Sequence, residues 1–307
     1  MNFSGNSAYC YSNSLQMCLQ HAGMADVPAV GLLEAVTGMP FGTCFLDLDQ
    51  PMFFASPAGT EPHEGLSRAL ATLGWSCQLW QGDEPAAAQA TLVEALQSGP
   101  VLVGPLDMGH LVYDPQHENK AGGDHFLVAL SIDGELVTVH DPQYYPYALL
   151  SLSELLLAWD AAGMAYIDHR FTLRHGFHQE QTRTWSEIVA ATLAAAHKLQ
   201  TQAVTGPVFY SGAAAFAKAR ALVEATPAPA FAGLLTHFSL PIGARRSLDA
   251  EHFMLAAGEQ TLSERYGLKA RLYGQGQYRA ATQQWSALAD ILRQLEAVEG
   301  ELMRLMA

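Results

Sequence analysis

Three residues of this sequence have types and spacing that could form a thiol-based catalytic site. Cys10 lies near the start of the chain, His125 opens an apolar segment far downstream, and Asp141 follows the histidine by 16 positions. A carboxylate that binds an imidazole fixes the tautomer of the ring and stabilises the imidazolium that forms when the ring takes a proton. With a cysteine as nucleophile, such a set could catalyse acyl transfer or hydrolysis.

Each of these residues also has an ordinary structural explanation when it is taken alone. His125 could be a hydrogen-bonded core histidine, and Asp141 could cap a turn before Pro142. Cys10 could be a small buried side chain. The three residues together, and the elements predicted around them, favour the catalytic interpretation.

A predicted β-hairpin carries the histidine and the aspartate. Residues 126–130 are continuously apolar, Asp133-Gly134 is a hairpin-turn dipeptide, and residues 135–140 return as a strand with β-branched Val and Thr. A strict two-residue loop would pair His125 with Pro142. We expect instead a three-residue loop or a bulge, which would place His125 directly opposite Asp141.

The cysteine is predicted to open a helix. Apolar residues recur at helical spacing from Leu15 to Ala22, and Gly23 follows as a stop signal. The unpaired backbone N–H groups at a helix start, together with the positive end of its dipole, favour a thiolate there. The N–H of Cys10 is also a ready donor to the oxyanion of an acyl-transfer intermediate.

The pattern of the chain changes near residue 180. Before this point, short predicted strands alternate with helices, and the last of these strands covers residues 165–172. After it come Ala- and Leu-rich helical segments separated by Gly- and Pro-containing breaks, at 185–203, 212–225, 247–265 and 276–306. We predict an α+β fold with two domains, a mixed domain with an antiparallel sheet at 1–180 and an all-helical domain at 181–307.

Composition argues against several functional classes. The chain has 16 basic and 30 acidic residues and a formal charge of −14, whereas nucleic-acid binding needs clustered Lys and Arg. Its four cysteines lack C-x-x-C spacing, so neither a zinc site nor a disulfide framework is indicated. No signal-peptide pattern opens the sequence, and no apolar run reaches about 18 residues. We expect a cytoplasmic protein without a membrane span.

The order and spacing of the candidate residues resemble the papain-like superfamily, and more closely the butirosin biosynthesis protein H family. The motifs in the first half are Tyr9-Cys10-Tyr11-Ser12, Gly99-Pro100-Val101-Leu102-Val103, Asp107 with Leu111-Val112-Tyr113, and Gly123-Asp124-His125-Phe126-Leu127-Val128. Those in the second half are Arg245-Arg246, Phe253-Met254-Leu255-Ala256-Ala257, and the segment from Tyr278 to Leu292 with Trp285.

This resemblance implies a papain-like catalytic domain followed by a helical domain, and an acyltransferase without a cofactor or a metal. Cys10 would be the nucleophile, His125 the base and Asp141 its orienting partner. The acyl donor would be the thioester of an acyl carrier protein or another pantetheine. The acceptor would be a small amine, in the biosynthesis of a specialised metabolite.

The resemblance leaves the oxyanion and substrate contacts less well defined. Papain-like enzymes have a glutamine six positions before the cysteine, where this chain has Ser4, so we expect Asn6, the nearest amide, to serve instead. Asp107 follows a predicted strand and is our candidate for holding a cationic amine, although it could equally be a solvated loop residue. Tyr113 is a second candidate for substrate binding.

Two surfaces could bind other proteins. A carrier protein is normally acidic, so docking on a chain of this charge requires a local basic patch, for which the candidates are Lys218, Arg220, Arg245 and Arg246. The long terminal helix has a broad apolar face that could pack internally or form a homodimer with another copy.

Three other functions are alternatives to acyl transfer, and the sequence supports them to different degrees. A cysteine peptidase or amidase would use the same three residues on a peptide bond. A catalytically idle papain-like fold could serve as a carrier-binding scaffold, in which case Cys10 would not be unusually reactive. A metal hydrolase lacks support because the histidines show no H-E-x-x-H or comparable spacing; they are His63, His110, His117, His125 and His140.

Overall fold

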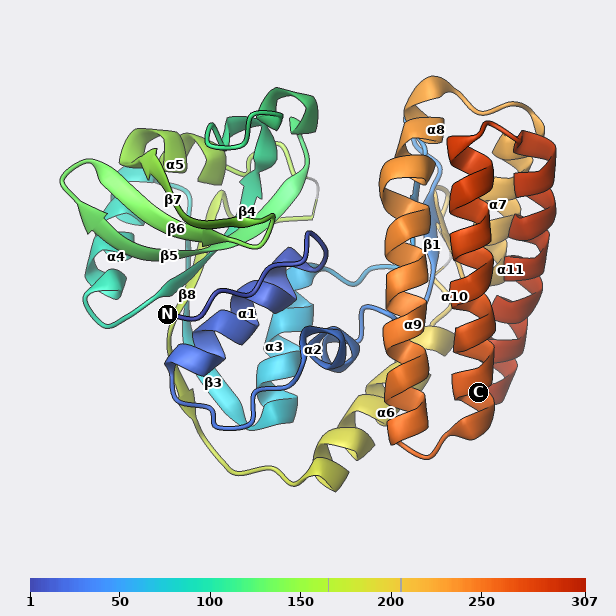
Figure 1. Cartoon of the computed structure of the whole chain (residues 1–307), viewed down its shortest axis with the longest axis horizontal. Helices are drawn as coiled ribbons and strands as arrows, with labels where there is room; N and C mark the ends of the chain where they lie inside the picture. The colour runs from blue at the N-terminus through green and yellow to red at the C-terminus, as the bar shows by residue number, and fades with distance from the viewer. Residues whose placement is uncertain (165, 205) are drawn as a thin grey trace. The chain divides into compact units, whose positions relative to one another are not determined.

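The computed structural model describes residues 1–164, 166–204 and 206–307 and divides the chain into two compact units (Figure 1). The first unit comprises Met1–Val30 and Leu73–Thr182, and the second comprises Gly31–Thr72 and Arg183–Ala307. The predicted boundary near residue 180 therefore lies where the chain leaves the first unit for the last time. The structure assigns residues 31–72 to the second unit, whereas the sequence analysis placed them in the first domain.

The first unit is built on a six-stranded antiparallel sheet with the strand order β3-β8-β4-β5-β6-β7. The strands are β3 (Trp75–Gly82), β4 (Val101–Asp107), β5 (Asp124–Asp133), β6 (Leu136–Asp141), β7 (Tyr145–Ser151) and β8 (Phe171–Gln179). Helices accompany this antiparallel sheet, which confirms the α+β class. The strand predicted at 165–172 lies later in the chain as β8, and Ala165, its predicted first residue, lies outside the described residues.

Helices cover both faces of this sheet. The helices α4 (Pro85–Leu96) and α5 (Leu152–Trp159) share a buried core with Leu127, Ala129 and other residues of one face. Successive side chains of a strand point to opposite faces, so Phe126 belongs to the other face. There the ring of Tyr11, in α1 (Cys10–His21), packs edge-on against Phe126 with 6.0 Å between centroids. The helix α1 thus lies across the sheet on the face opposite α4 and α5 (Figure 1).

The hairpin β5–β6 has a different register from the one expected. Asp133 pairs with Leu136, which makes Gly134-Glu135 the turn, and a bulge between Ala129 and Ser131 shifts the pairing by one residue. The last pair is Val128 with His140, and the same register continued would place Asp141 opposite Leu127. The expectation that His125 lies directly opposite Asp141 is therefore wrong. The two residues are diagonal neighbours on one face of the sheet.

The second unit is not all-helical, in contrast to the prediction. Its helices are α2 (Val30–Thr37), α3 (Pro62–Leu73), α6 (Trp185–Thr201), α7 (Ala213–Glu224), α8 (Pro229–Leu234), a π-helical turn (Leu235–Ser239), α9 (Leu240–Ala256), α10 (Gln260–Ala281) and α11 (Trp285–Met306). A three-stranded antiparallel sheet with the order β2-β1-β9 accompanies them, formed by β1 (Cys44–Leu46), β2 (Met52–Phe54) and β9 (Phe209–Ser211).

Aromatic side chains explain why the segment 31–72 joins this unit. Phe41, Phe45 and Phe53 are almost completely buried, and they belong to the same apolar cluster as the long helices. The edge of the Phe53 ring meets Phe216 of α7 with 5.4 Å between centroids. The apolar face of α11 is also buried within this cluster. The sequence left open whether this terminal helix packs internally or pairs with another copy, and in the structure it packs internally.

Two buried ion pairs also connect this segment to the helices. Arg246 of α9 donates to the carboxylate of Glu34 at 2.9 Å and to the carbonyl oxygen of Ala55 at 3.1 Å. Lys269 of α10 donates to Glu299 at 2.6 Å and to the hydroxyl of Thr43 at 3.3 Å. A buried charge is tolerated only when it is paired, so these contacts fix how the segment lies against the helices.

The described helices include none with the length and apolar character needed to cross a bilayer.

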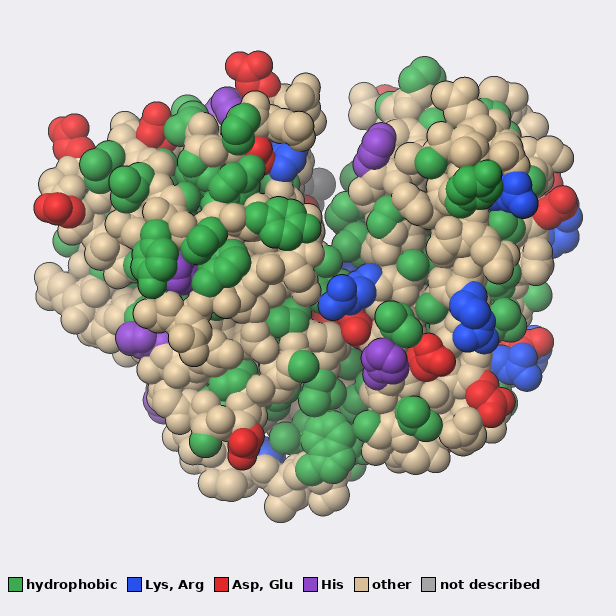
Figure 2. Space-filling view, viewed as in Figure 1, with side chains coloured by type: hydrophobic (Ala, Val, Ile, Leu, Met, Phe, Trp, Pro, Cys, Tyr) green, Lys and Arg blue, Asp and Glu red, His purple; other side chains and the backbone are tan. Residues whose placement is uncertain are grey.

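On the face shown in Figure 2, apolar side chains gather over β6 and β7. Leu136, Tyr147 and Leu149 are each about half exposed there, and β7 is an edge strand of the sheet.

We predict that Glu34→Ala destabilises the second unit by about 3–5 kcal/mol, because it leaves the buried guanidinium of Arg246 without its carboxylate. Chemical denaturation measures this change. The double variant Glu34→Leu/Arg246→Met removes both charges and should lose much less stability. If Glu34→Ala unfolds at the wild-type denaturant concentration, the segment 31–72 does not belong to this core.

Candidate active site

Cys10 is the first residue of α1 and is partly exposed. Two non-glycine residues just before it, Ser7 and Tyr9, have positive φ angles of 62° and 55°. Residues in this region of φ/ψ space cost of order 1–3 kcal/mol each and persist only where their surroundings impose them. The backbone that delivers the thiol is therefore a strained turn.

The buried side chain of Asn13 holds this turn in place. Its Nδ2 donates to the carbonyl oxygens of Ala8 at 2.7 Å and Tyr9 at 3.0 Å, and to Oδ1 of Asn6 at 3.0 Å. The N–H of Ser7 donates to the carbonyl oxygen of Pro142 at 3.2 Å. Since Pro142 directly follows β6, the turn before Cys10 is anchored beside Asp141.

The structure brings the three predicted residues together. His125 Nε2 lies 2.7 Å from Asp141 Oδ1, and both side chains are about 2% exposed. Cys10 is the other group whose interaction raises the pKa of His125, so the thiol lies next to the imidazole. Because Asp141 occupies Nε2, Nδ1 is the ring nitrogen that faces the thiol. The imidazole is thus bound by a carboxylate through Nε2 and has the thiol as its other polar neighbour.

The position of His125 depends on a close backbone approach from β4. Leu106 pairs with His125, and the register of β4 against β5 shifts between Val103 and Leu106. Gly104 lies in this irregularity with a φ of +150°, and a Cβ there would come within 2.8 Å of the carbonyl oxygen of His125. Glycine is therefore required at this position.

Asp141 accepts hydrogen bonds from two further groups. The backbone N–H of Gln143 donates to Oδ1 at 2.7 Å, and the hydroxyl of Tyr113 donates to Oδ2 at 2.7 Å. Tyr113, expected to contact substrate, thus contacts the carboxylate that holds the histidine. Burial and the neighbouring negative charge of Asp141 keep the pKa of the Tyr113 hydroxyl well above its usual value, so this group remains a donor.

These contacts shift the pKa values of the pair in opposite directions. Burial alone would lower the pKa of His125, but the charge and hydrogen bond of Asp141, together with Cys10, raise it to about 10. Burial alone would raise the pKa of Asp141, but His125, Gln143 and Tyr113 lower it. The favoured state is therefore an imidazolium beside a carboxylate, which places a positive charge next to the thiol.

A second set of polar contacts surrounds the loop that follows Asp141. The ammonium of Lys120 donates to Asp114 at 2.6 Å and to the side-chain oxygen of Gln143 at 2.7 Å. Asp114 is almost completely buried and also accepts from the hydroxyl of Tyr145 at 3.0 Å. The backbone of Gln143, which binds Asp141, is thereby held by its own side chain.

Asp107 ties its own loop together. Its Oδ1 accepts from the backbone N–H groups of Gly109 and Gly122, both at 2.8 Å. One carboxylate oxygen is thus committed to joining the two ends of the loop between β4 and β5. The expected role of Asp107 in binding an amine stays a prediction.

Asn6, the residue expected in the oxyanion hole, uses its side-chain oxygen for structure. Oδ1 accepts from the N–H of Ala8 at 3.1 Å as well as from Asn13. The nitrogen end of the amide is the end that could donate to a substrate oxygen. The role of Asn6 as a donor in the oxyanion hole stays a prediction.

The remaining thiols differ from Cys10 in their surroundings. Burial raises the pKa of Cys18 strongly, that of Cys44 to about 11, and that of Cys77. These side chains therefore remain protonated at neutral pH. Within the described residues, no group of three or more His, Cys, Asp or Glu side chains is arranged to hold a metal ion.

Sequence reasoning missed Tyr113 and Gln143 as partners of Asp141. A signal for Gln143 was present, because Asp side chains commonly accept from the backbone N–H two residues later, and Asp141-Pro142-Gln143 has the required order. Tyr113 gave no such signal. It precedes Asp141 by 28 positions and reaches it only through the fold.

We predict that Asp141→Asn destabilises the first unit by roughly 3 kcal/mol in a pH-dependent manner, because the variant lacks the buried ion pair. The raised pKa of His125 gives stability that is complete below pH 6.5 and is lost as pH rises towards about 10. The lowered pKa of Asp141 gives stability that is present above pH 3.8 and is lost as pH falls through the folded-state value. The loss in the variant should therefore be greatest between pH 3.8 and 6.5.

Hydrogen–deuterium exchange of the β5 and β6 amides, corrected for intrinsic exchange rates, measures this difference. Tyr113→Phe is the matched control, since it keeps the ion pair and removes one donor at a cost of about 1–2 kcal/mol. In Tyr113→Phe, the decrease of stability at alkaline pH should match that of the wild type. The decrease of stability at acid pH should begin at a higher pH, because Asp141 loses a donor that lowers its pKa. A loss in Asp141→Asn that did not vary with pH would contradict the proposed charge state.

Comparison with known proteins shows that part of the second unit is similar to a known domain family. Residues 206–307 match the family described as the YobF C-terminal domain. The chain is also 34% identical over 168 residues to the uncharacterized protein YobF of Bacillus subtilis (strain 168), an alignment that covers 53% of this chain and 52% of the relative. The chain thus spans about half the length of this curated relative. The segment from β9 to α11 is therefore similar to the C-terminal domain of YobF.

Proposed function

We propose that the chain is a thiol-dependent acyltransferase with a papain-like catalytic domain. Cys10 takes an acyl group from a pantetheine thioester, carried by an acyl carrier protein, and passes it to an amine. The observation that carries this proposal is the buried pair His125–Asp141 next to Cys10, which is partly exposed at the first turn of a helix. The motifs shared with the butirosin biosynthesis protein H family support the same reaction class.

The first half-reaction loads the enzyme. The Cys10 thiolate attacks the carbonyl carbon of the thioester, and the electron pair of the C=O bond moves onto oxygen. When the intermediate collapses, the bond from carbon to the pantetheine sulfur breaks. The leaving sulfur takes the proton of the His125 imidazolium, which leaves a neutral imidazole beside an acyl-Cys10 thioester.

The second half-reaction transfers the acyl group. The attacking amine is in its neutral form; it attacks the carbonyl carbon of acyl-Cys10, and neutral His125 takes the one proton that the amine loses. The bond from carbon to the Cys10 sulfur then breaks, which releases the amide and regenerates the thiolate and imidazolium. Exchange between two thioesters is close to thermoneutral, whereas formation of the amide makes the sequence favourable.

The residues around Cys10 have distinct tasks in this proposal. The backbone N–H of Cys10 and Nδ2 of Asn6 donate to the oxyanion. Asp141 and Tyr113 orient the imidazole and do not touch the substrate. Asp107 offers Oδ2 to a cationic group of the acceptor other than the attacking amine, since the hydrogen bonds within its loop use Oδ1.

Intact-mass analysis after mixing the protein with a panel of acyl-pantetheine thioesters tests the loading step. The wild type should gain the mass of one acyl group, Cys10→Ala should gain none, and His125→Ala should load more slowly by at least about a hundredfold. Cys77→Ala is the matched control and should load like the wild type. An acyl mass that persists in Cys10→Ala would contradict the proposal.

Addition of an amine to the loaded protein then separates the alternatives. Release of the acyl group as an amide supports acyl transfer, whereas release only as a free acid favours a hydrolase. If no thioester loads Cys10 but an alkylating reagent modifies it rapidly, a peptidase or amidase is the better assignment. If no thioester loads Cys10 and the alkylating reagent also modifies it slowly, a non-catalytic scaffold is the better assignment.

A further inference from the structure

The basic patch expected to dock a carrier protein is neutralised in the structure. All four of its side chains bond to carboxylates within the second unit. The pairs are Lys218 with Asp47 at 2.9 Å, Arg220 with Glu224 at 3.0 Å, Arg245 with Asp249 at 3.2 Å, and the buried Arg246 with Glu34 at 2.9 Å. The net charge of this patch is close to zero, so it does not provide a positive docking surface.

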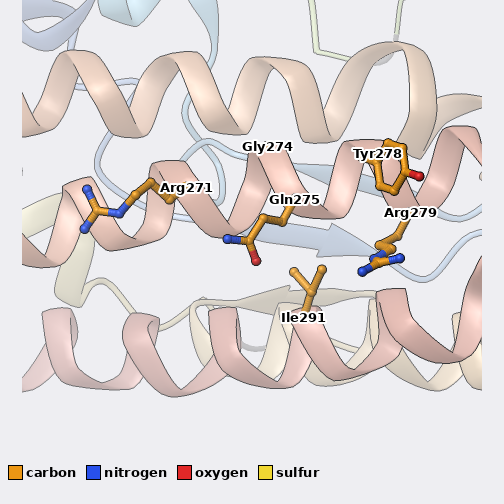
Figure 3. A pocket seen from close by; sticks show the side chains of 6 residues that line it. All are labelled: Arg271, Gly274, Gln275, Tyr278, Arg279 and Ile291. Atoms are coloured by element: carbon orange, nitrogen blue, oxygen red, sulfur yellow. The ribbon is translucent and has the colours of Figure 1, made fainter.

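A different surface of the second unit carries positive charge. A groove of about 530 Å³ lies along α10, where Figure 3 shows Arg271, Gln275 and Arg279 along the helix and Ile291 reaching towards them from α11. Gly274 and Tyr278 complete its lining. The two arginines and Gln275 are spaced four residues apart, so they form one stripe on the helix. None of the residues that line the groove is acidic.

Neither arginine of this groove is paired with a carboxylate of the described residues. Arg279 donates to the side-chain oxygen of Gln284 and lies 5.4 Å from the centre of the Tyr278 ring, and neither contact neutralises its charge. Arg271 is exposed. In the described part of the chain, no carboxylate oxygen lies within 4.0 Å of either guanidinium. The groove therefore keeps two positive charges on a chain whose net charge is −14.

Gly274 gives a second, independent indication that this surface binds a partner. It lies in the interior of the 22-residue helix α10, where glycine costs roughly 1 kcal/mol relative to alanine. Among the described residues, a Cβ at this position would meet nothing within 4 Å, so no packing between them requires glycine. Close approach of another backbone to the groove would explain its presence.

We propose that this groove docks an acidic helix of the acyl carrier protein that delivers the thioester, an inference that rests on the proposed function. Arg271 and Arg279 are eight residues apart, which corresponds to about 12 Å along α10. Carboxylates seven or eight residues apart on one face of a partner helix match this distance. Gly274, between the arginines, lets that helix approach closely. The negative charge of the rest of the chain disfavours other docking positions.

Titration of a bacterial acyl carrier protein, in its pantetheine-bearing form without an acyl group, measures docking independently of any reaction. We expect Arg271→Glu/Arg279→Glu to weaken binding at least tenfold. Lys198→Glu/Arg304→Glu makes the same charge change at two exposed cations outside the groove, and should bind like the wild type. The wild-type affinity should fall as salt concentration rises.

A neutral variant separates shape from charge. Gly274→Phe adds an uncharged ring at the groove, and the Cβ of the new side chain meets none of the described residues within 4 Å. It should also weaken carrier binding while the protein stays folded, with a melting temperature no lower than that of the wild type. Equal affinities in all the variants, or no measurable binding by the wild type, would overturn the docking proposal.

Loading of Cys10 from free acyl-pantetheine keeps the two proposals apart. This donor has no protein to dock, so Arg271→Glu/Arg279→Glu should load from it at the wild-type rate and lose only loading from the acylated carrier. If carrier binding depends on the groove but Cys10 never becomes acylated, the docking surface stands and the acyltransferase assignment fails. If both donors load all variants equally, the acyltransferase assignment stands and the docking surface is wrong.

Discussion

The first unit depends on one buried carboxylate, that of Asp141, which binds three donors at once. They come from three segments of the chain: His125 at the start of β5, Gln143 just after β6, and Tyr113 in the loop after β4. A buried carboxylate is tolerated in its charged form only when it is surrounded in this way. Because Asp141 stays charged, the imidazole of His125 holds its proton, and a positive charge faces the thiol of Cys10. The electrostatics of the candidate site thus follow from the hydrogen bonds of one side chain.

The turn that positions the Cys10 thiol next to the positive charge of His125 is strained. Positive φ angles at Ser7 and Tyr9 cost conformational energy, which Asn13 and the bond from Ser7 to Pro142 offset. The same segment after β6 therefore holds both halves of the site, since Pro142 anchors the turn before Cys10 and Gln143 binds Asp141. The cysteine and the histidine, far apart in the sequence, are brought together through this short stretch.

Part of this arrangement could be predicted from the sequence, and physical reasons explain the rest. Helical spacing and a hairpin dipeptide located Cys10, His125 and Asp141, because those signals are local. The register of the hairpin was wrong, because the bulge at Ala129 and the turn at Gly134-Glu135 depend on packing across the sheet. The segment 31–72 joined the second unit because Phe45 and Phe53 pack among its helices, a contact with no local signal. Arg246 reads as a surface cation in the sequence, and only the fold reveals its buried partner Glu34.

The protonation state of His125 tests the account most directly. The chain contains 12 histidines, so the ring-nitrogen signals of His125 in a protein labelled with ¹⁵N-histidine are assigned by their loss in His125→Gln. If Asp141 and Cys10 act as described, both ring nitrogens stay protonated through neutral pH, and the ring titrates near pH 10. A ring that titrates near its ordinary pKa of 6.5, and is neutral at pH 8, would contradict the charge state on which the proposed activation of Cys10 depends.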